Sequence, residues 1–411
     1  MGGRHKLFVS KRDPQSTTCT KTYEVNQRCW IKLSAVFEPD VTGDWEFGLV
    51  VAAGQGDLYI EGEKVIDNTV DQKPSGLLPV VYNLEIRFNN HHPVPGQVIP
   101  MRRGAIELGG RPVTEAEEML QEAERTAREA DVAIVAVGLN QDWECEGYDH
   151  DSMKLPGKSD ELVQRVLLAN PRTVVILQSG TPVELSWVDH CQTLLQGHYG
   201  GNQFGNGIAD VIFGARNPSG RLSVTYPYKY QHNPAFYNWG HEGNKTMYGE
   251  GVFVGYKHYD AVDREVMFPF GHGLSYHSSV ISDVETQPLK TTSSIANTPV
   301  AILSFMVQNV GEVGGRESVQ IYVARSDGIG RVPEKELRDF IKVELGAGEK
   351  RTCSVQLTLE AFAYFDTSAD KWTVDAGDYN VLLGSSSRDI KESVDMFIET
   401  KASWLEYSKL K

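Results

Sequence analysis

The chain has 411 residues, a formal net charge of -15 at pH 7 and a hydrophobic fraction of 40%. At about 100–200 residues per domain, this length predicts two to four domains. The charges are spread along the chain, which argues against nucleic acid as a partner because phosphates require clustered Lys and Arg. No window approaches the ~20 consecutive apolar residues that span a bilayer, so a membrane partner is not expected either.

The cysteines and the first residues add little about function. No two cysteines form a CxxC pair and no histidines cluster near them, so a zinc site is not expected. Mostly buried free thiols are the favoured interpretation. The opening segment, MGGRHKLFVSKRD, lacks the apolar core of a signal peptide and starts abruptly. This start favours a fragment and leaves open whether the protein is secreted or cytoplasmic.

Residues 1–112 predict an antiparallel β-sandwich. The segments that alternate apolar and polar residues and end in turn residues are WIKLSAVFEPD, DWEFGLVVAAG, GDLYIEGEKVIDN and VVYNLEIRFNN. This alternation, bounded by Gly, Asp or Asn, is typical of strands in a two-sheet domain.

Residues 113–278 alternate predicted helices and strands. The predicted helices lie in TEAEEMLQEAERTAREAD, in SDELVQRVLLANP, which a Ser cap opens, and in NQFGNGIADVIFG. Strands are predicted at residues 132–137 and in TVVILQSG and RLSVTYP. The alternation predicts an α/β sandwich with a mainly parallel sheet, and such sheets bind ligands at the carboxyl ends of their strands.

Residues 279–400 return to short alternating segments, which predict a small immunoglobulin-like β-sandwich. The segments are SFMVQNVGEVGGRESVQIYVA, KRTCSVQLTL, KWTVDAG and DYNVLLGSS. The polar residues 401–411 predict a peripheral tail.

An acidic segment, WECEGYDHD, follows the first predicted strand of the α/β domain. Its carboxylates are Glu144, Glu146, Asp149 and Asp151. A carboxyl group can serve as a proton donor when burial or a neighbouring carboxylate raises its pKa. Glu146 precedes a glycine that allows a sharp turn. From the residues alone, solvated loop charges without a catalytic role are the more ordinary interpretation.

Several segments resemble family 3 glycoside hydrolases, the β-glucosidase group. EGYDHDSMKLPGKSDELV is similar to the E-G-x-D-R signature of their second domain, and YGEGVFVGYKHYD and FPFGHGLSY follow in family order. WTVDAGDYNVLLGSS resembles the family's fibronectin type III-like domain. GDWEFGLVVAAGQGDLYIEGEKVIDN is similar to a protective-antigen-type sandwich of some members, here without its first strands. The resemblance therefore gives each of the three predicted domains a counterpart.

The resemblance implies part of a retaining β-glucosidase, which releases glucose from β-glucosides and cello-oligosaccharides by double displacement. It assigns the general acid/base to Glu146, with Glu144 as a rival, and implies no cofactor or metal. Family members begin with a (β/α)8 barrel that carries the aspartate nucleophile, and no stretch of this chain resembles it. The barrel is therefore an expected partner, and a homodimer stays open. A non-catalytic carbohydrate-binding or scaffold fragment is the alternative.

Four neighbours of Glu146 are further candidates. Trp143 and Tyr148 could stack on a sugar ring, although core packing explains them equally well. Asp149 matches the family's aspartate and is expected to hold the loop through backbone N–H groups. His150 stands where the family usually has Arg, and it lacks the constant charge and paired donors of Arg. We therefore expect His150 to loosen the loop or to shift the pH optimum.

Overall fold

The computed structural model describes residues 30–37, 45–51, 55–67, 82–89, 106–112, 115–140, 143–144, 146, 150, 152–239, 245–290, 295–325 and 332–405. The chain divides into two compact units, Met1–Gln121 and Glu122–Lys411. The second unit holds most of the α/β domain and the whole of the third domain.

The first unit forms only strands and turns in its described residues up to Pro112, and the start of α1 (Ala116–Glu129) follows at its end. Its strands are β1 (Trp30–Phe37), β2 (Trp45–Val51), β3 (Gln55–Ile60), β4 (Glu63–Asp67), β5 (Tyr82–Asn89) and β6 (Ile106–Pro112). They form an antiparallel sheet in the order β1-β5-β3-β4 and an antiparallel pair, β2-β6. The alternating apolar residues of these strands form one core: Phe47, Leu49, Leu58, Ile60, Ile66, Leu84 and Ile86. The described strands agree with an antiparallel domain.

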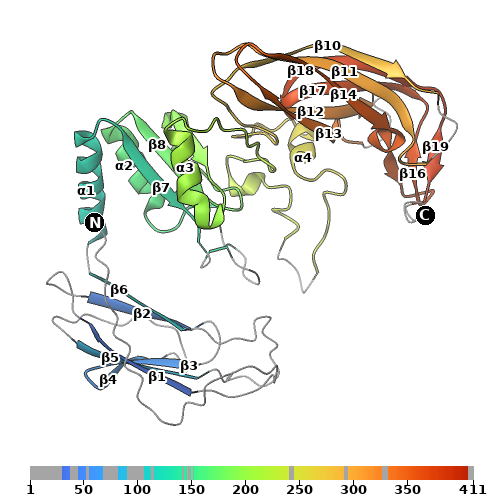
Figure 1. The fold of residues 1–411 in the computed structure, drawn as a ribbon. Helices are drawn as coiled ribbons and strands as arrows, with labels where there is room; N and C mark the ends of the chain where they lie inside the picture. Colours follow the sequence, from blue (N-terminus) through green and yellow to red (C-terminus); the bar gives the residue numbers. More distant parts are fainter. Residues whose placement is uncertain are drawn as a thin grey trace, which may run out of the picture. The chain divides into compact units, whose positions relative to one another are not determined.

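A parallel sheet in the order β7-β8-β9 forms the centre of the α/β domain (Figure 1). Its strands are β7 (Ala133–Gly138), β8 (Thr173–Gln178) and β9 (Thr193–Gln196). The helices are α1 (Ala116–Glu129), α2 (Ser159–Ala169), α3 (Phe204–Ile212), α4 (Tyr256–Ala261) and the short 3-10 helices η1 (Val188–His190), η2 (Gly201–Gln203) and η3 (Tyr230–His232). The prediction of a mainly parallel sheet is confirmed. Its strands all point the same way, so their carboxyl ends share one edge.

Two local predictions in this domain are wrong. RLSVTYP forms no strand, and only an isolated bridge joins Tyr226 to Phe268. The backbone of this segment pairs irregularly with residues 267–272 instead of with the parallel sheet. Helix α2 has Lys158 rather than a serine at its N-cap, and the Lys158 side chain makes no capping hydrogen bond.

The third domain is a β-sandwich. Its elements are β10 (Ser279–Pro288), β11 (Pro299–Asn309), β12 (Gly315–Arg325), β13 (Glu336–Leu345), β14 (Lys350–Thr358), η4 (Leu359–Phe362), β15 (Tyr364–Asp366), β16 (Lys371–Val374), β17 (Gly377–Ser386), β18 (Asp389–Ile398) and β19 (Ala402–Trp404). The two larger sheets have the orders β10-β11-β14 and β13-β12-β17-β18, and a smaller sheet is β15-β16-β19. One apolar core includes fully buried residues of both larger sheets, such as Leu303, Phe305, Ile321 and Leu383. The predicted sandwich is therefore confirmed.

The end of this domain differs from the predicted tail over residues 401–411. Residues 402–404 form β19, which pairs with β16 through Trp372 and Trp404. Ala402 and Trp404 are buried in the apolar core of the domain. Two apolar residues with one residue between them point to the same face of a strand, which is why this short segment joins the sheet.

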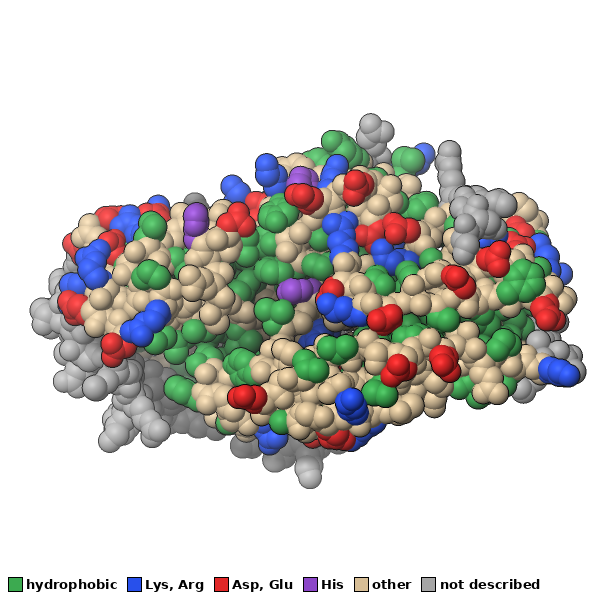
Figure 2. Space-filling view, turned by 90° about the horizontal axis from the view of Figure 1, so that it is seen from above, with side chains coloured by type: hydrophobic (Ala, Val, Ile, Leu, Met, Phe, Trp, Pro, Cys, Tyr) green, Lys and Arg blue, Asp and Glu red, His purple; other side chains and the backbone are tan. Residues whose placement is uncertain are grey.

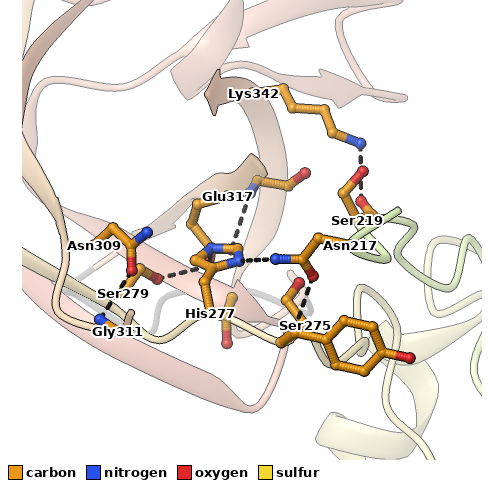
Figure 3. Close-up of polar contacts among 12 residues, drawn as sticks. Asn217, Ser219, Ser275, His277, Ser279, Asn309, Gly311, Glu317 and Lys342 are labelled. Atoms are coloured by element: carbon orange, nitrogen blue, oxygen red, sulfur yellow. Dashed lines mark hydrogen bonds and ion pairs between the residues drawn. The ribbon is translucent and has the colours of Figure 1, made fainter. Parts of the chain in front are cut away.

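A buried polar network joins the α/β domain to the third domain, and Figure 3 shows its central residues. Glu317 of β12 accepts hydrogen bonds from Arg221 Nη2 at 2.8 Å and from Ser279 Oγ at 2.6 Å. His277 Nε2 lies 3.6 Å from Glu317 Oε2, and the Asn217 amide lies 3.2 Å from His277 Nδ1. Glu317 therefore links Arg221 of the α/β domain to Ser279 of the third domain. Arg221 Nε and His277 Nε2 are buried without a hydrogen-bond partner of their own among the described residues.

A second polar contact lies between α4 and the third domain. Asp260 is bridged by Lys335 Nζ at 2.9 Å and by Arg388 Nε at 3.0 Å. The side chains of Asp260 and Lys335 are both nearly buried. Buried ion pairs tolerate little change of geometry, since each charge depends on its partner. The two contacts together hold the domains to each other.

Gly138 at the end of β7 is in register with Gln178 of β8, and this gives the first testable prediction. A Cβ on Gly138 would lie 1.9 Å from the carbonyl oxygen of Gln178. We expect Gly138→Ala to lower the free energy of unfolding by about 1–3 kcal/mol in urea denaturation, because the backbone of the neighbouring strand must shift. Gly205→Ala in α3 is the control, since a Cβ there meets no described atom within 4 Å. It should raise stability by up to about 1 kcal/mol, and equal losses in both variants would contradict the close approach.

Candidate functional site

The carboxyl ends of β7 and β8 lie side by side and position the acidic segment. Gly138 is in register with Gln178, and the Leu139 N–H donates to the Gln178 carbonyl at 2.7 Å. The chain then turns at once, because the Asn140 carbonyl accepts the N–H groups of Trp143 at 3.0 Å and Glu144 at 2.8 Å. Glu144, the first carboxylate of the segment, is thus placed at the carboxyl edge of the parallel sheet.

The Glu144 carboxylate is bound by the loops that follow β8 and β9. The Gly180 N–H donates to Oε2 at 2.7 Å and the Thr181 N–H donates to Oε1 at 2.8 Å. The Thr181 hydroxyl also donates to Oε1, and the Tyr199 hydroxyl donates to Oε2. We call Glu144, Gly180, Thr181 and Tyr199 the carboxylate clamp.

The clamp changes the pKa of both acidic groups in it. Burial acts to raise the pKa of Glu144, but the hydrogen bonds from Thr181, Tyr199 and Gly180 outweigh burial and lower it. Burial and the hydrogen bond to Glu144 raise the pKa of Tyr199 to about 12. Hydrogen bonds to the ionised form of a carboxyl group favour that form. Glu144 is therefore a carboxylate and Tyr199 a neutral phenol at neutral pH.

Glu146 differs from Glu144 in its surroundings. Its side chain is exposed and makes no hydrogen bond or ion pair with any other residue that the structure describes. Two residues of chain span at most about 7 Å, so Glu146 stays close to the clamp. The two rival glutamates thus lie close together, but among the described residues only Glu144 is held by hydrogen bonds.

Trp143 and His150 lie beside the two glutamates. The Trp143 side chain is 45% exposed, so part of the indole is available to a ligand. The half-buried His150 contacts the Trp143 carbonyl oxygen through Nε2. Tyr148 and Asp149, the other predicted site residues, lie outside the described residues.

Gly180, Thr181 and Tyr199 are site residues that the sequence interpretation missed. They follow the second and third strands of the sheet, in QSGT and HYGG. In a parallel sheet these strand ends share an edge with the end of β7, and this was the available signal. Gly180 also lies close to the other members, since a Cβ there would be 3.1 Å from the Tyr199 ring and 3.3 Å from Glu144 Oε2.

Metal and membrane features are absent from the described part of the chain. No cluster of three or more His, Cys, Asp or Glu residues there could hold a metal ion. None of its helices is long and apolar enough to cross a membrane. Its two cysteines are free thiols, of which Cys353 is buried and Cys191 is half-buried.

Comparison with protein families identifies the chain. Residues 25–276 match the model described as the glycosyl hydrolase family 3 C-terminal domain. The chain belongs to glycosyl hydrolase family 3. Residues 317–387 match a fibronectin type III-like domain, which confirms the predicted type of the third domain. The family model extends over much of the first unit without specifying a protective-antigen-type sandwich.

Individual relatives agree with this family. A probable beta-glucosidase H of Neosartorya fischeri is 39% identical over 395 residues, which are 91% of this chain and 47% of the relative. The crystal structure of a beta-glucosidase from Kluyveromyces marxianus in complex with glucose has a TM-score of 0.83 at 36% identity, over 92% of this chain and 46% of that one. DesR, a beta-glucosidase from Streptomyces venezuelae, has a TM-score of 0.67 at 26% identity. The chain spans about half the length of the curated relatives it matches.

Proposed function

We propose that this chain is the C-terminal part of a retaining β-glucosidase and that Glu146 is its general acid/base. One observation carries the proposal. Glu146 is an exposed carboxylate, without a described partner, beside the carboxyl edge of the parallel sheet in a family 3 chain. A proton donor must be able to reach the glycosidic oxygen. Among the described residues none binds the Glu146 side chain, whereas four donors bind the Glu144 carboxylate.

The proposed reaction needs two carboxyl groups about 5–5.5 Å apart. A nucleophilic carboxylate attacks the anomeric carbon while Glu146 protonates the leaving oxygen. Glu146 then removes a proton from the water that hydrolyses the glycosyl intermediate. The nucleophile is expected on a (β/α)8 barrel outside this chain, and no step requires a cofactor or metal.

The proposed substrates are terminal β-D-glucosyl residues of β-glucosides and cello-oligosaccharides. The beta-glucosidase names of the relatives and the glucose in the Kluyveromyces marxianus structure support this choice. The exposed ring of Trp143 supports stacking on a sugar, and the contact of His150 with the Trp143 carbonyl supports a loop-holding role. The roles of Tyr148 and Asp149 rest on the family resemblance, as does the protective-antigen-type sandwich at residues 1–112. The same holds for the domain boundaries at 113–278 and 279–400.

Exposed hydrophobic side chains support a docking partner such as the barrel. Between residues 237 and 254 the large exposed ones include Tyr237, Trp239, Met247 and Tyr248, with exposed fractions of 84%, 51%, 69% and 88%. Figure 2, which identifies no single residue, also shows hydrophobic side chains at the surface near the middle of the face that it draws. Soluble proteins rarely leave large apolar patches uncovered unless they bind a partner there.

The test is hydrolysis of a chromogenic β-glucoside by this chain, alone and mixed with a separately expressed barrel half of the Kluyveromyces marxianus enzyme. We expect hydrolysis only in the mixture, because double displacement needs both carboxyl groups. Hydrolysis by the chain alone would place a nucleophile within these 411 residues and overturn the division of the site. If neither sample hydrolyses the glucoside, the non-catalytic carbohydrate-binding or scaffold alternative would be favoured.

A further inference from the structure

We infer that Glu144 is a positioning residue, which ties the segment that carries Glu146 to the edge of the sheet. The inference rests on the proposed function, since it assigns Glu144 a role in the same reaction. It agrees with the proposal that Glu146, and not Glu144, is the group that transfers the proton.

The clamp connects three strand ends. Glu144 follows β7, its partners Gly180 and Thr181 follow β8, and Tyr199 follows β9. Both carboxylate oxygens accept two hydrogen bonds each, so the side chain has little capacity left for a substrate. An ionised carboxylate offers about four acceptor positions, and here the four donors occupy them. The Glu144 side chain therefore fixes the loop after β7 to the loops after β8 and β9.

The ionised state of Glu144 agrees with this role. A proton donor has to be protonated when the substrate binds, whereas the clamp lowers the pKa of Glu144. A lowered pKa means that the clamp stabilises the fold above the ordinary carboxyl pKa, and that this contribution is lost as pH falls through the lowered value. The clamp is thus complete at neutral pH, where the carboxylate accepts from all four donors.

A second contact joins the two sides of the acidic segment. His150 Nε2 meets the carbonyl oxygen of Trp143, the residue before Glu144. Glu146 lies between these two attachment points, so the clamp and the His150 contact limit where it can move. Positioning matters because a displacement of about 1 Å at a reacting group can cost on the order of 100-fold in rate.

Amide hydrogen exchange of the purified chain tests the clamp without any activity. In Glu144→Ala we expect the amides of Gly180 and Thr181 to exchange about tenfold faster or more, because they lose their acceptor. Glu122→Ala is the matched control, since the contacts described for Glu122 are with exposed Arg125 and with Thr126, both on α1. Unchanged exchange at residues 180 and 181 in Glu144→Ala would overturn the inference.

Leaving-group dependence in the mixture with the barrel half tests the positioning role. For Glu144→Gln we expect kcat/KM for cellobiose to fall on the order of 100-fold. The value for 2,4-dinitrophenyl β-glucoside should fall less than about threefold, because its leaving group departs without a proton. Tyr199→Phe should show a smaller loss in the same direction. A purely structural role would lower both values equally, and equal losses or no loss would overturn the inference. Inactivity of the wild-type mixture itself would instead overturn the proposed function, and the positioning role with it.

Discussion

Glu146→Ala is expected to lower kcat/KM for cellobiose in the reconstituted mixture by about 100- to 10,000-fold, the range that general acid catalysis contributes. The alanine leaves the glycosidic oxygen without a proton donor. Activated aryl glucosides should be much less affected in the first step, since their leaving groups need no protonation. For these substrates the glycosyl intermediate should accumulate, because no base remains to activate water.

Added azide should restore turnover of the activated glucoside by Glu146→Ala, because azide attacks the intermediate without a general base. The product is expected to be β-glucosyl azide, with the configuration of the substrate retained. Glu122→Ala should keep wild-type rates with and without azide. A loss below tenfold in Glu146→Ala, or a variant that azide does not rescue, would mean that another residue is the acid/base.

Glu317→Ala is expected to lower the free energy of unfolding by about 3–5 kcal/mol, the usual result of removing one member of a buried ion pair. Arg221 is only 11% exposed and would lose the carboxylate 2.8 Å away. His277, whose side chain is fully buried, would lose the carboxylate that lies 3.6 Å from its Nε2. Urea denaturation followed by circular dichroism measures the change.

Glu344→Ala is the matched control for the junction. Glu344 also lies in a sheet of the third domain and pairs with Arg316 at 3.0 Å, but its side chain is 70% exposed. Its loss should cost at most about 1 kcal/mol. The double variant Arg221→Met with Glu317→Leu should be less destabilised than Glu317→Ala, because it leaves no unpaired buried charge. Equal stability of Glu317→Ala and Glu344→Ala would show that the junction network does not hold the domains together.

Local patterns in the sequence were sufficient for the domain types and for the acidic segment. Apolar and polar residues that alternate one by one predict strands, and helical patterns between strands predict a parallel sheet. These patterns depend on near neighbours in the chain, so they are visible without a structure. The same reasoning failed for RLSVTYP, because Leu222 and Tyr226 of this segment form backbone hydrogen bonds with residues 267–272 instead of with the sheet. It also failed for residues 402–404, which form a strand because they pair with β16, a strand that is distant in the sequence.

The sequence by itself determined that this is a family 3 chain with carboxylates beyond the first strand of its α/β domain. The family resemblance favours Glu146 over Glu144, but the residues alone do not explain the choice, because the two are chemically identical and only two positions apart. The tertiary structure decided their surroundings through partners far along the chain. Gly180 and Tyr199, which bind the Glu144 carboxylate, lie 36 and 55 residues after it. Hydrogen bonds between separate strand ends form only when the sheet assembles, and they leave one glutamate bound and the other exposed.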